Sequence, residues 1–199
     1  HEDLSIEERA KIKARQGVEL VSSGELLVVD EDGAEVPHDG KSLGEITVRG
    51  NVVMSGYFND PEATEAAIKN GWFRSGDAAV VNQDGYVEIR DRFKDVIISG
   101  GENISSVELE GCLLSHPAVQ EVAVVGMRHE KWGEAPHAFV VLKQDVKTSE
   151  DELKLHVRDR LAHFKTPQWV SFVDELPKTA TGKVQKFVLR GRKTGIVQQ

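Results

Sequence analysis

The sequence contains one cysteine, Cys112, among 199 residues, which excludes an internal disulfide and a metal site built from several cysteines. Cys112 lies beside Leu113 and Leu114 in a predicted helix, and these neighbours favour a buried structural thiol over a nucleophile. The seven histidines form no His-x-x-x-His pattern, so we expect no zinc site. A chain without disulfides fits a reducing compartment, and we expect a cytoplasmic protein.

An excess of positive charge and long apolar runs are also absent. The formal net charge of -8 argues against a general surface for nucleic acid or anionic membranes, because both are negatively charged. No apolar run approaches the length of a membrane-spanning helix. The composition, 39% hydrophobic and 29% charged, is typical of a globular chain with one large or two small domains.

The first half of the chain has the pattern of a β-rich domain. Ser5 and Glu8 have capping-box spacing at the start of a charged helix, residues 6–16. Asp60-Pro61 predicts the start of a second helix, and Asn70-Gly71 its end. Strands are expected at residues 25–30, 44–49, 78–81 and 86–90. Short strands at this spacing are typical of a small β-barrel or a piece of one.

After Arg92 the pattern is mixed α and β. Ser105 and Ser149 each precede a glutamate at capping-box spacing and predict helix starts. We expect helices at 106–115, 149–163 and up to 192, and strands at 121–127, 138–143 and 169–173. The sequence therefore predicts an α+β fold. A partial β-barrel subdomain, residues 1–91, precedes a small α+β domain, residues 92–199, with a three-stranded sheet and flanking helices.

The boundary lies in a stretch that also carries the most informative motif, residues 91–110 (DRFKDVIISGGENISSVELE). Residues 91–95 are too charged for a buried core strand, whereas residues 96–98 suit one. Gly100-Gly101 allows positive φ and close approach of a ligand or backbone. The alternative interpretation is a surface turn followed by an ordinary strand-turn-helix connection.

Three motifs occur in order: GWFRSGD at 71–77, the GGENIS stretch at 100–105, and PKTATGK at 177–183. Together they resemble the last motifs of the adenylate-forming superfamily, which includes acyl-CoA synthetases, luciferases and nonribosomal adenylation domains. GGENIS and Trp132-Gly133-Glu134 resemble the acyl-CoA synthetase branch. The resemblance runs from about Gly24 to Arg190, nearly the whole chain.

The family's Ser/Thr/Gly-rich phosphate loop and its acidic magnesium-holding motif are not in the sequence. The chain therefore resembles the C-terminal portion of a larger enzyme, with a lid domain at its end. The resemblance implies a fatty-acid or other carboxylic-acid CoA ligase that uses ATP, Mg²⁺ and coenzyme A, and whose missing N-terminal domain is a partner. Two alternatives stay open: an adenylation domain that loads a carrier protein, and a non-catalytic lid or binding fragment. The isolated chain is expected to be inactive, and its Mg²⁺ ligands to lie elsewhere.

The resemblance also implies residue roles. Lys183 approaches the α-phosphate of ATP and the substrate carboxylate, and the alternative is a solvated surface lysine. Asp77 accepts hydrogen bonds from the ribose hydroxyls, with Arg92 as a second ribose contact from the far side of the domain joint. The alternatives are a strand-end turn residue for Asp77, and for Arg92 a surface ion pair with Asp91 or Asp95.

The remaining implied roles concern domain rotation and coenzyme A. Lys94 falls on the family's hinge position, where a solvated residue changes φ and ψ. Gly100 and Gly101 line the pantetheine tunnel, where a side chain would narrow the passage. Trp132 and Phe164 pack against coenzyme A, with core packing as the alternative for Phe164. Beside Phe164, Thr166 offers no charge for the coenzyme's phosphates.

Overall fold

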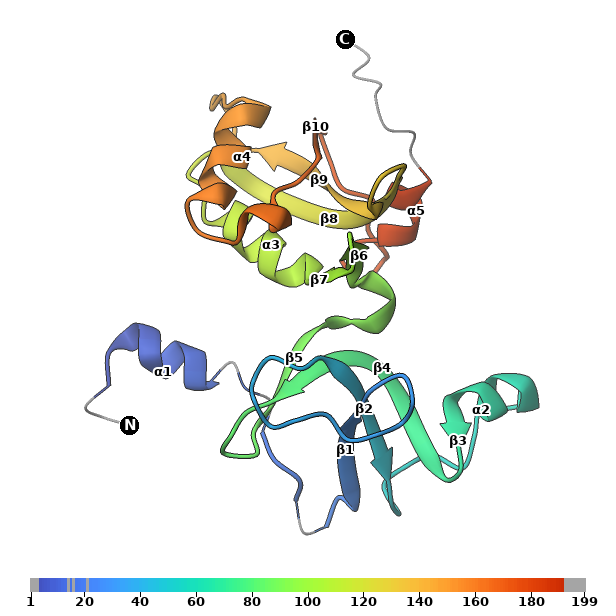
Figure 1. Cartoon of the computed structure of the whole chain (residues 1–199). Helices are drawn as coiled ribbons and strands as arrows, with labels where there is room; N and C mark the ends of the chain where they lie inside the picture. The colour runs from blue at the N-terminus through green and yellow to red at the C-terminus, as the bar shows by residue number, and fades with distance from the viewer. Residues whose placement is uncertain (1–3, 14, 16, 21, 192–199) are drawn as a thin grey trace. The chain divides into compact units, whose positions relative to one another are not determined.

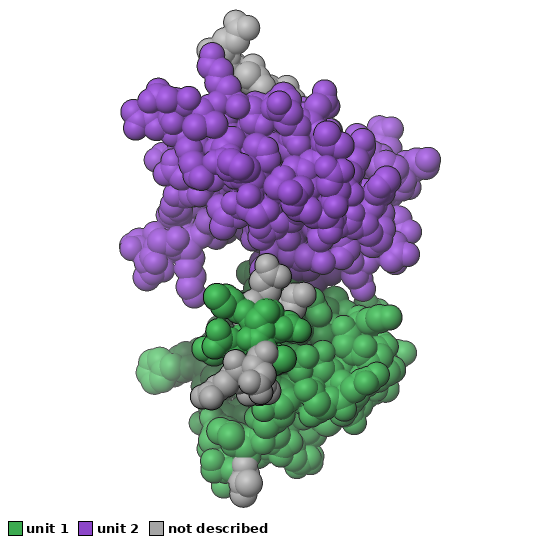
Figure 2. Space-filling view, turned by 90° about the vertical axis from the view of Figure 1, so that its left-hand side faces the viewer, with its two compact units in different colours: residues 1–94 green, residues 95–199 purple. Residues whose placement is uncertain are grey.

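A computed structural model describes residues 4–13, 15, 17–20 and 22–191. The chain divides into two compact units, residues 1–94 and 95–199, coloured green and purple in Figure 2. The division follows Lys94, a little after the boundary at residue 91 that the sequence predicted. We call these unit 1 and unit 2.

Unit 1 is built on one antiparallel sheet. Its elements are α1 (Ile6–Lys13), β1 (Glu25–Val29), β2 (Gly44–Arg49), α2 (Pro61–Ala67), β3 (Ile68–Lys69), β4 (Trp72–Val81) and β5 (Val87–Arg92). The strand order is β1-β2-β4-β3, and β5 pairs with β4. Register shifts between Glu45 and Thr47 and between Ala78 and Ala79 bend the strands. The sheet accordingly curls into the open half-barrel of Figure 1.

Local sequence signals account for most of these elements. The amide N–H of Glu8 donates to the Ser5 hydroxyl at 3.2 Å, and the Glu8 carboxylate accepts from the Ser5 N–H at 2.9 Å, so the predicted capping box forms. Asp60 caps α2 by accepting from the Ala63 N–H at 2.9 Å, as predicted.

The predicted end of α2 is wrong. The helix stops at Ala67, and Asn70 and Gly71, with φ of 52° and 81°, form the two-residue turn of the β3–β4 hairpin. Consecutive residues at positive φ match a type I′ hairpin turn, for which Asn-Gly is the preferred pair. The same dipeptide therefore serves a hairpin instead of a helix terminus.

Unit 2 carries a second sheet with helices on both faces (Figure 1). The elements from the joint onward are η1 (Phe93–Asp95), β6 (Ile97–Ser99), β7 (Glu102–Ile104), α3 (Ser106–Leu114), β8 (Val119–His129), β9 (Gly133–Leu142), α4 (Glu150–Arg158), η2 (His163–Lys165), β10 (Trp169–Phe172) and α5 (Lys186–Arg190). The order is β10-β9-β6-β7, with β8 on β9 and β10 parallel to β9. The α+β class is confirmed, and the short strands β6 and β7 extend the predicted three-stranded sheet.

Two apolar clusters hold unit 2 together. Leu109 and Leu113 of α3 and Leu153 and Val157 of α4 pack on one sheet face, and Leu189 of α5 packs on the other. The side chain of Cys112 lies against the first cluster, and burial raises the pKa of its thiol. This environment fits the structural role expected for Cys112, because a neutral thiol is a poor nucleophile.

Two helices of unit 2 begin where their caps predicted. Ser105 and Ser149 accept hydrogen bonds from the N–H groups of Glu108 and Glu152, and Ser149 with Glu152 completes a capping box. However, α4 ends at Arg158, before the predicted His163, because Ala162 takes an extended conformation with ψ of 141°. Among the described residues, no helix is long and apolar enough to cross a membrane.

Candidate functional site

Asp77 and Arg92 meet on neighbouring strands of unit 1. They are register partners between β4 and β5, and Arg92 Nε lies 3.1 Å from Asp77 Oδ1. The Arg92 guanidinium also donates to the Ser75 carbonyl at 3.3 Å. The predicted pair of residues is thus brought together, and Arg92 belongs to unit 1 rather than to the far side of the joint. The predicted boundary after residue 91 places Asp77 and Arg92 in different domains, whereas their cross-strand pairing places both in unit 1.

The Asp77 carboxylate keeps capacity for a ligand. Its side chain is 26% exposed and that of Arg92 57% exposed, so both remain accessible. A carboxylate offers about four lone-pair positions, of which the Arg92 Nε bond occupies one. The alternative partner for the Arg92 guanidinium, Asp91, instead accepts the backbone N–H of Arg92 at 2.7 Å.

The charged joint is more buried than its composition predicted. Asp91 lies inside β5 and is 4% exposed, which corrects the expectation that residues 91–95 stay out of the core. Asp95 is 9% exposed and forms an ion pair with Arg190 of α5. Pairing of this kind is what makes a buried carboxylate tolerable. Lys94, between them in η1, is exposed and is the last residue of unit 1.

Gly100 and Gly101 form the turn of the β6–β7 hairpin, so the expected strand-turn-helix connection is wrong. Their φ angles are 61° and 87°, which L side chains rarely adopt. A Cβ on Gly100 would lie 3.6 Å from Cδ1 of Trp132, whereas one on Gly101 would have no neighbour within 4 Å. Within unit 2, backbone conformation and not crowding explains both glycines.

The strand before this turn also differs from the prediction. Ile97 is fully buried, but Ile98 is 55% exposed, so residues 96–98 do not form a strand buried on both faces. Alternation of buried and exposed side chains is the ordinary result when one strand face meets a core. The exposed face of β6 therefore leaves the turn glycines at the surface of the unit.

A cavity of 580 Å³ in unit 2 unites three of the predicted coenzyme A residues: Gly100, Trp132 and Phe164. They come from the β6–β7 turn, the β8–β9 turn and η2, which are separate segments of the chain. Trp132 is 40% exposed and stacks on His129 with ring centroids 4.4 Å apart. Phe164 is 46% exposed, which argues against the alternative of core packing. Gly101 is not among the lining residues.

Charged residues of the same cavity were missed from the sequence. Lys154 and Arg158 line it from α4, and Glu102 lines it from β7. The available signal was the i, i+4 spacing of Lys154 and Arg158, which places both on one helix face. Nothing in the sequence showed that this face would turn toward Phe164.

Lys183 lies at the end of a tight loop that begins at Thr179, near the C-terminal end of the described chain. The Thr179 N–H donates to the Lys183 carbonyl at 2.8 Å, and the Lys183 N–H donates to the Thr179 hydroxyl at 3.1 Å. Gly182, at φ 84°, allows the turn. The Lys183 side chain is exposed, and within the described part of the chain its ammonium has no ion-pair partner. It does not line the 580 Å³ cavity.

The helix that follows Lys183 is firmly attached. Lys186 Nζ lies 2.7 Å from Glu110 Oε1 and 2.6 Å from Ser106 Oγ, which ties α5 to α3. Glu110 in turn accepts from the backbone N–H of Val124 at 2.8 Å. The exposed lysine is therefore carried on a loop with an ordered base, an arrangement that suits a positioned cation.

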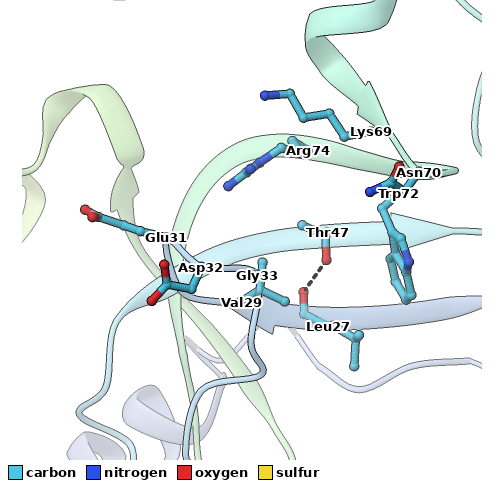
Figure 3. A pocket seen from close by; sticks show the side chains of 10 residues that line it. All are labelled: Leu27, Val29, Glu31, Asp32, Gly33, Thr47, Lys69, Asn70, Trp72 and Arg74. Carbon is cyan, nitrogen blue, oxygen red and sulfur yellow. Dashed lines mark hydrogen bonds between the residues drawn. The ribbon is translucent and has the colours of Figure 1, made fainter.

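Unit 1 has a cavity of its own, of 270 Å³, on one face of the sheet (Figure 3). Two of its polar groups already have partners: Arg74 pairs with the Glu45 carboxylate at 2.6 Å, and the Thr47 hydroxyl donates to the Leu27 carbonyl at 3.3 Å. Neither Asp77 nor Arg92 lines it. No three His, Cys, Asp or Glu side chains of the described residues gather as a metal site.

Residues 108–183 match the family model described as the AMP-binding enzyme C-terminal domain. The chain is 54% identical over 190 residues to a probable acyl-activating enzyme 6 from Arabidopsis thaliana, covering 94% of this chain and 34% of that protein. It is 49% identical over 188 residues to the peroxisomal trans-cinnamate:CoA ligase of Petunia hybrida, covering 94% of this chain and 33% of the ligase.

The fold is also similar to that of a solved CoA synthetase structure. The o-succinylbenzoate CoA synthetase of Bacillus subtilis, in complex with its acyl-adenylate intermediate, aligns with a TM-score of 0.83 and 38% identity, covering 98% of this chain and 39% of that one. The chain thus spans about a third of the length of the curated relatives it matches.

Proposed function

We infer that this chain, whose residues 108–183 match the model of the AMP-binding enzyme C-terminal domain, is the C-terminal part of an ATP-dependent carboxylic acid–CoA ligase. In the first step a carboxylate oxygen attacks the α-phosphorus of ATP, and pyrophosphate leaves. In the second step the coenzyme A sulfur attacks the acyl carbonyl, and AMP leaves. The observation that carries this proposal is the cavity uniting Gly100, Trp132 and Phe164 from separate segments.

Asp77 and Arg92 are proposed to hold the ribose of the nucleotide. Vicinal ribose hydroxyls are paired donors, and one carboxylate can accept both. The Arg92 ion pair supports this role, because it fixes the orientation of the Asp77 carboxylate while leaving it exposed. Each side chain then binds substrate and transition state alike, so its loss raises the Michaelis constant for ATP more than it lowers kcat.

Lys183 is proposed to act in the transition state of the first step. Negative charge builds up on the oxygens around the pentacoordinate phosphorus, and a placed ammonium stabilises that charge more than it stabilises the ground state. Its lack of an acidic partner among the described residues supports the role, since the charge is not already neutralised. The second step does not need this cation.

Lys94 is proposed as the hinge between the two steps, and Gly100 and Gly101 as walls of the pantetheine passage. An exposed residue in a short 3-10 turn changes φ and ψ without losing buried contacts, which supports the role of Lys94. The glycine pair keeps the tip of the β6–β7 hairpin free of side chains beside the 580 Å³ cavity.

The remaining partners are proposed from the reaction. The rest of the longer protein supplies the Mg²⁺ ligands and the acyl pocket, and the named acids of the relatives differ, so the proposal extends to carboxylic acids as a class. A cytoplasmic location stays part of the proposal, and the Petunia relative carries a peroxisomal name.

A chimera tests the proposal. Residues 1–199 replace the C-terminal third of the Petunia trans-cinnamate:CoA ligase, to which they are 49% identical. The chimera is expected to exchange pyrophosphate into ATP and to form cinnamoyl-CoA, whereas the isolated chain does neither. A folded chimera that performs neither step contradicts the proposal.

Lys183→Ala in the chimera separates the two half-reactions. Loss of the cation is expected to slow pyrophosphate exchange by about 10²–10³-fold, comparable to losing an oxyanion-hole donor. Lys183→Arg is not expected to restore the rate, because a planar guanidinium differs in shape from a compact ammonium. Thioester formation from synthetic cinnamoyl-AMP is expected to stay nearly unchanged, and equal loss of both steps contradicts the assignment of Lys183.

A further inference from the structure

Helix α5 follows Lys183 closely and is too short to keep its place alone. It has five residues, Lys186–Arg190, and within the described chain its N-cap residue Gln185 makes no side-chain capping hydrogen bond. Isolated helices of this length are unstable in water, because so few hydrogen bonds do not offset the entropy lost in ordering the first turn. The position of α5, and of the loop before it, therefore depends on contacts with other elements of unit 2.

Contacts along its whole length hold α5. Leu189 is fully buried in the apolar cluster on one face of the sheet. Arg190, at the end of the helix, forms an ion pair with Asp95. Lys186, at its start, extends to helix α3. Of these contacts, the one made by Lys186 is nearest in sequence to Lys183, which precedes it by about one helical turn.

The Lys186 contact joins three elements through one carboxylate. Glu110 Oε1 of α3 lies 2.7 Å from Lys186 Nζ and accepts from the backbone N–H of Val124 in β8 at 2.8 Å. The Lys186 ammonium also donates to the Ser106 hydroxyl at 2.6 Å. The side chains of Lys186 and Glu110 are only 16% and 21% exposed, so water and salt screen this pair less than a surface pair. The start of α5 is thus tied both to α3 and to the sheet.

The loop before α5 has a weaker anchor at its other end. Lys178 Nζ lies 2.7 Å from Glu121 Oε2, but the two side chains are 39% and 35% exposed, and exposed pairs contribute little. Within the loop, the Thr179 N–H donates to the Lys183 carbonyl at 2.8 Å. Because this bond closes the loop on itself, the loop follows the segment to which its end is attached. The Lys186 pair is therefore the contact that fixes where the Lys183 ammonium lies within unit 2.

We propose that the Lys186–Glu110 ion pair, with Ser106, positions the Lys183 ammonium for the first step of the proposed ligase reaction. Lys186 is a positioning residue: Glu110 neutralises its own ammonium and holds it against α3, so it acts through Lys183. A misplacement of about 1 Å can cost a reaction about 10²-fold in rate, even when the substituted residue lies away from the chemistry. The inference rests on the proposed function, but the anchoring of the loop can be measured without it.

Hydrogen exchange of the 199-residue chain measures the anchoring. Lys186→Met keeps an apolar stem and removes the ion pair, so the amides of Thr179 and Gln185, both hydrogen-bonded across the loop, are expected to exchange about tenfold faster. Lys186→Arg keeps a cation and is expected to retain most of the protection. Lys165→Met is the matched control, because Lys165 is 21% exposed and pairs with Glu108 of the same helix at 2.5 Å but belongs to η2. It is expected to leave both amides unchanged.

The two half-reactions of the chimera measure the consequence for Lys183. Lys186→Met is expected to lower kcat for pyrophosphate exchange about tenfold and to leave the Michaelis constant for ATP within about twofold, because the lost effect is confined to the transition state. Thioester formation from synthetic cinnamoyl-AMP is expected to stay unchanged. In a Lys183→Ala background, Lys186→Met is expected to have no further effect, since the group that it positions is gone. Glu110→Gln, which keeps an acceptor oxygen for the Val124 N–H, should act in the same direction with a smaller change.

Several results would overturn the proposal. One is unchanged amide exchange at Thr179 in the Lys186→Met chain, and another is equal loss of both half-reactions in the folded Lys186→Met chimera. A full additional loss in the Lys183→Ala background would show that Lys186 acts independently of Lys183. Equal effects of Lys165→Met would show a general loss of stability instead. A chimera that is inactive without any of these substitutions contradicts the proposed ligase function, and that failure is distinguishable because no variant is involved.

Discussion

The two units bury their sheets differently. Unit 2 has an apolar cluster on each sheet face, with ten buried residues on one and six on the other. In the described part of unit 1 there is one cluster of six buried residues, and helix α2 has no buried residue. Because burial of apolar surface is the main driving force of folding, we expect unit 2 to be more stable than unit 1.

Unit 1 also exposes several large apolar side chains. Phe58 is 92% exposed, and Val52 and Tyr57 of the same segment are 65% and 47% exposed. A cluster of large exposed apolar residues ordinarily marks an interaction surface. The segment that carries Phe58 is therefore a candidate interaction surface of unit 1.

The largest expected effect is in the core of unit 2. Leu109→Ala removes a fully buried side chain and is expected to lower the unfolding free energy of unit 2 by about 3 kcal/mol. Urea unfolding, followed by Trp132 and Trp169 in a Trp72→Phe background, measures it. The transition of unit 1, followed by Trp72 with the other two tryptophans replaced by phenylalanine, is expected to stay where it was. A common shift of both transitions would show that the units unfold as one.

Acid is expected to destabilise unit 2 through His137. The buried ring, with Nε2 at 2.8 Å from the Ser171 hydroxyl, has its pKa lowered to about 4 by burial. Below pH 6.5 His137 of the unfolded chain binds a proton, whereas His137 of the folded unit stays neutral down to about pH 4. The free energy of unfolding therefore falls as the pH drops from 6.5 toward 4. The loss is expected to reach about 2 kcal/mol by pH 5. His137→Gln should abolish most of this slope, and the exposed His163→Gln should not.

A smaller effect is expected at the β6–β7 turn. Gly100→Ala places a Cβ at φ 61° and is expected to cost unit 2 about 1 kcal/mol through backbone strain. Gly111→Ala, in the middle of α3 with open space around its Cβ position, is the control and should stabilise the unit slightly. Equal effects of the two variants would show that the positive φ is not maintained in solution.

The smallest effect is expected at the surface of unit 1. Phe58→Ser changes a side chain that is 92% exposed, and the stability of the isolated chain should shift by less than about 0.5 kcal/mol. In the chimera with the Petunia ligase the same variant is expected to lower thermal stability, because the apolar surface is then covered. If the variant is neutral in both proteins, Phe58 does not lie in an interface.

Local signals predicted more than long-range ones did. Caps at Asp60, Ser105 and Ser149 set helix starts correctly, because each capping side chain and the backbone N–H that donates to it lie three residues apart. The parallel pairing of β10 with β9 had no local signal, because it joins residues far apart in sequence. Asn70-Gly71 fits a helix end or a hairpin turn equally well, and only the neighbouring strand decides between them.

In the candidate site, too, residues within motifs were predicted and residues placed by long-range contacts were not. Gly100, Trp132 and Phe164 were predicted through motifs, and the cavity brings them together. Arg158 was missed, because an exposed arginine on a helix carries no mark of what lies beside it. Arg92 was assigned to the wrong side of the joint, since the end of β5 is decided by pairing with Asp77 and not by local charge.

The ion pair between Asp95 and Arg190 fixes where unit 2 begins. Arg92 is held in unit 1 by its pairing with Asp77, which leaves Phe93 and Lys94 as the tether. Even fully extended, two residues would span at most about 7 Å. A ligand bound to one unit is therefore presented to the other at high effective concentration, and cutting the chain at Lys94 would remove that advantage.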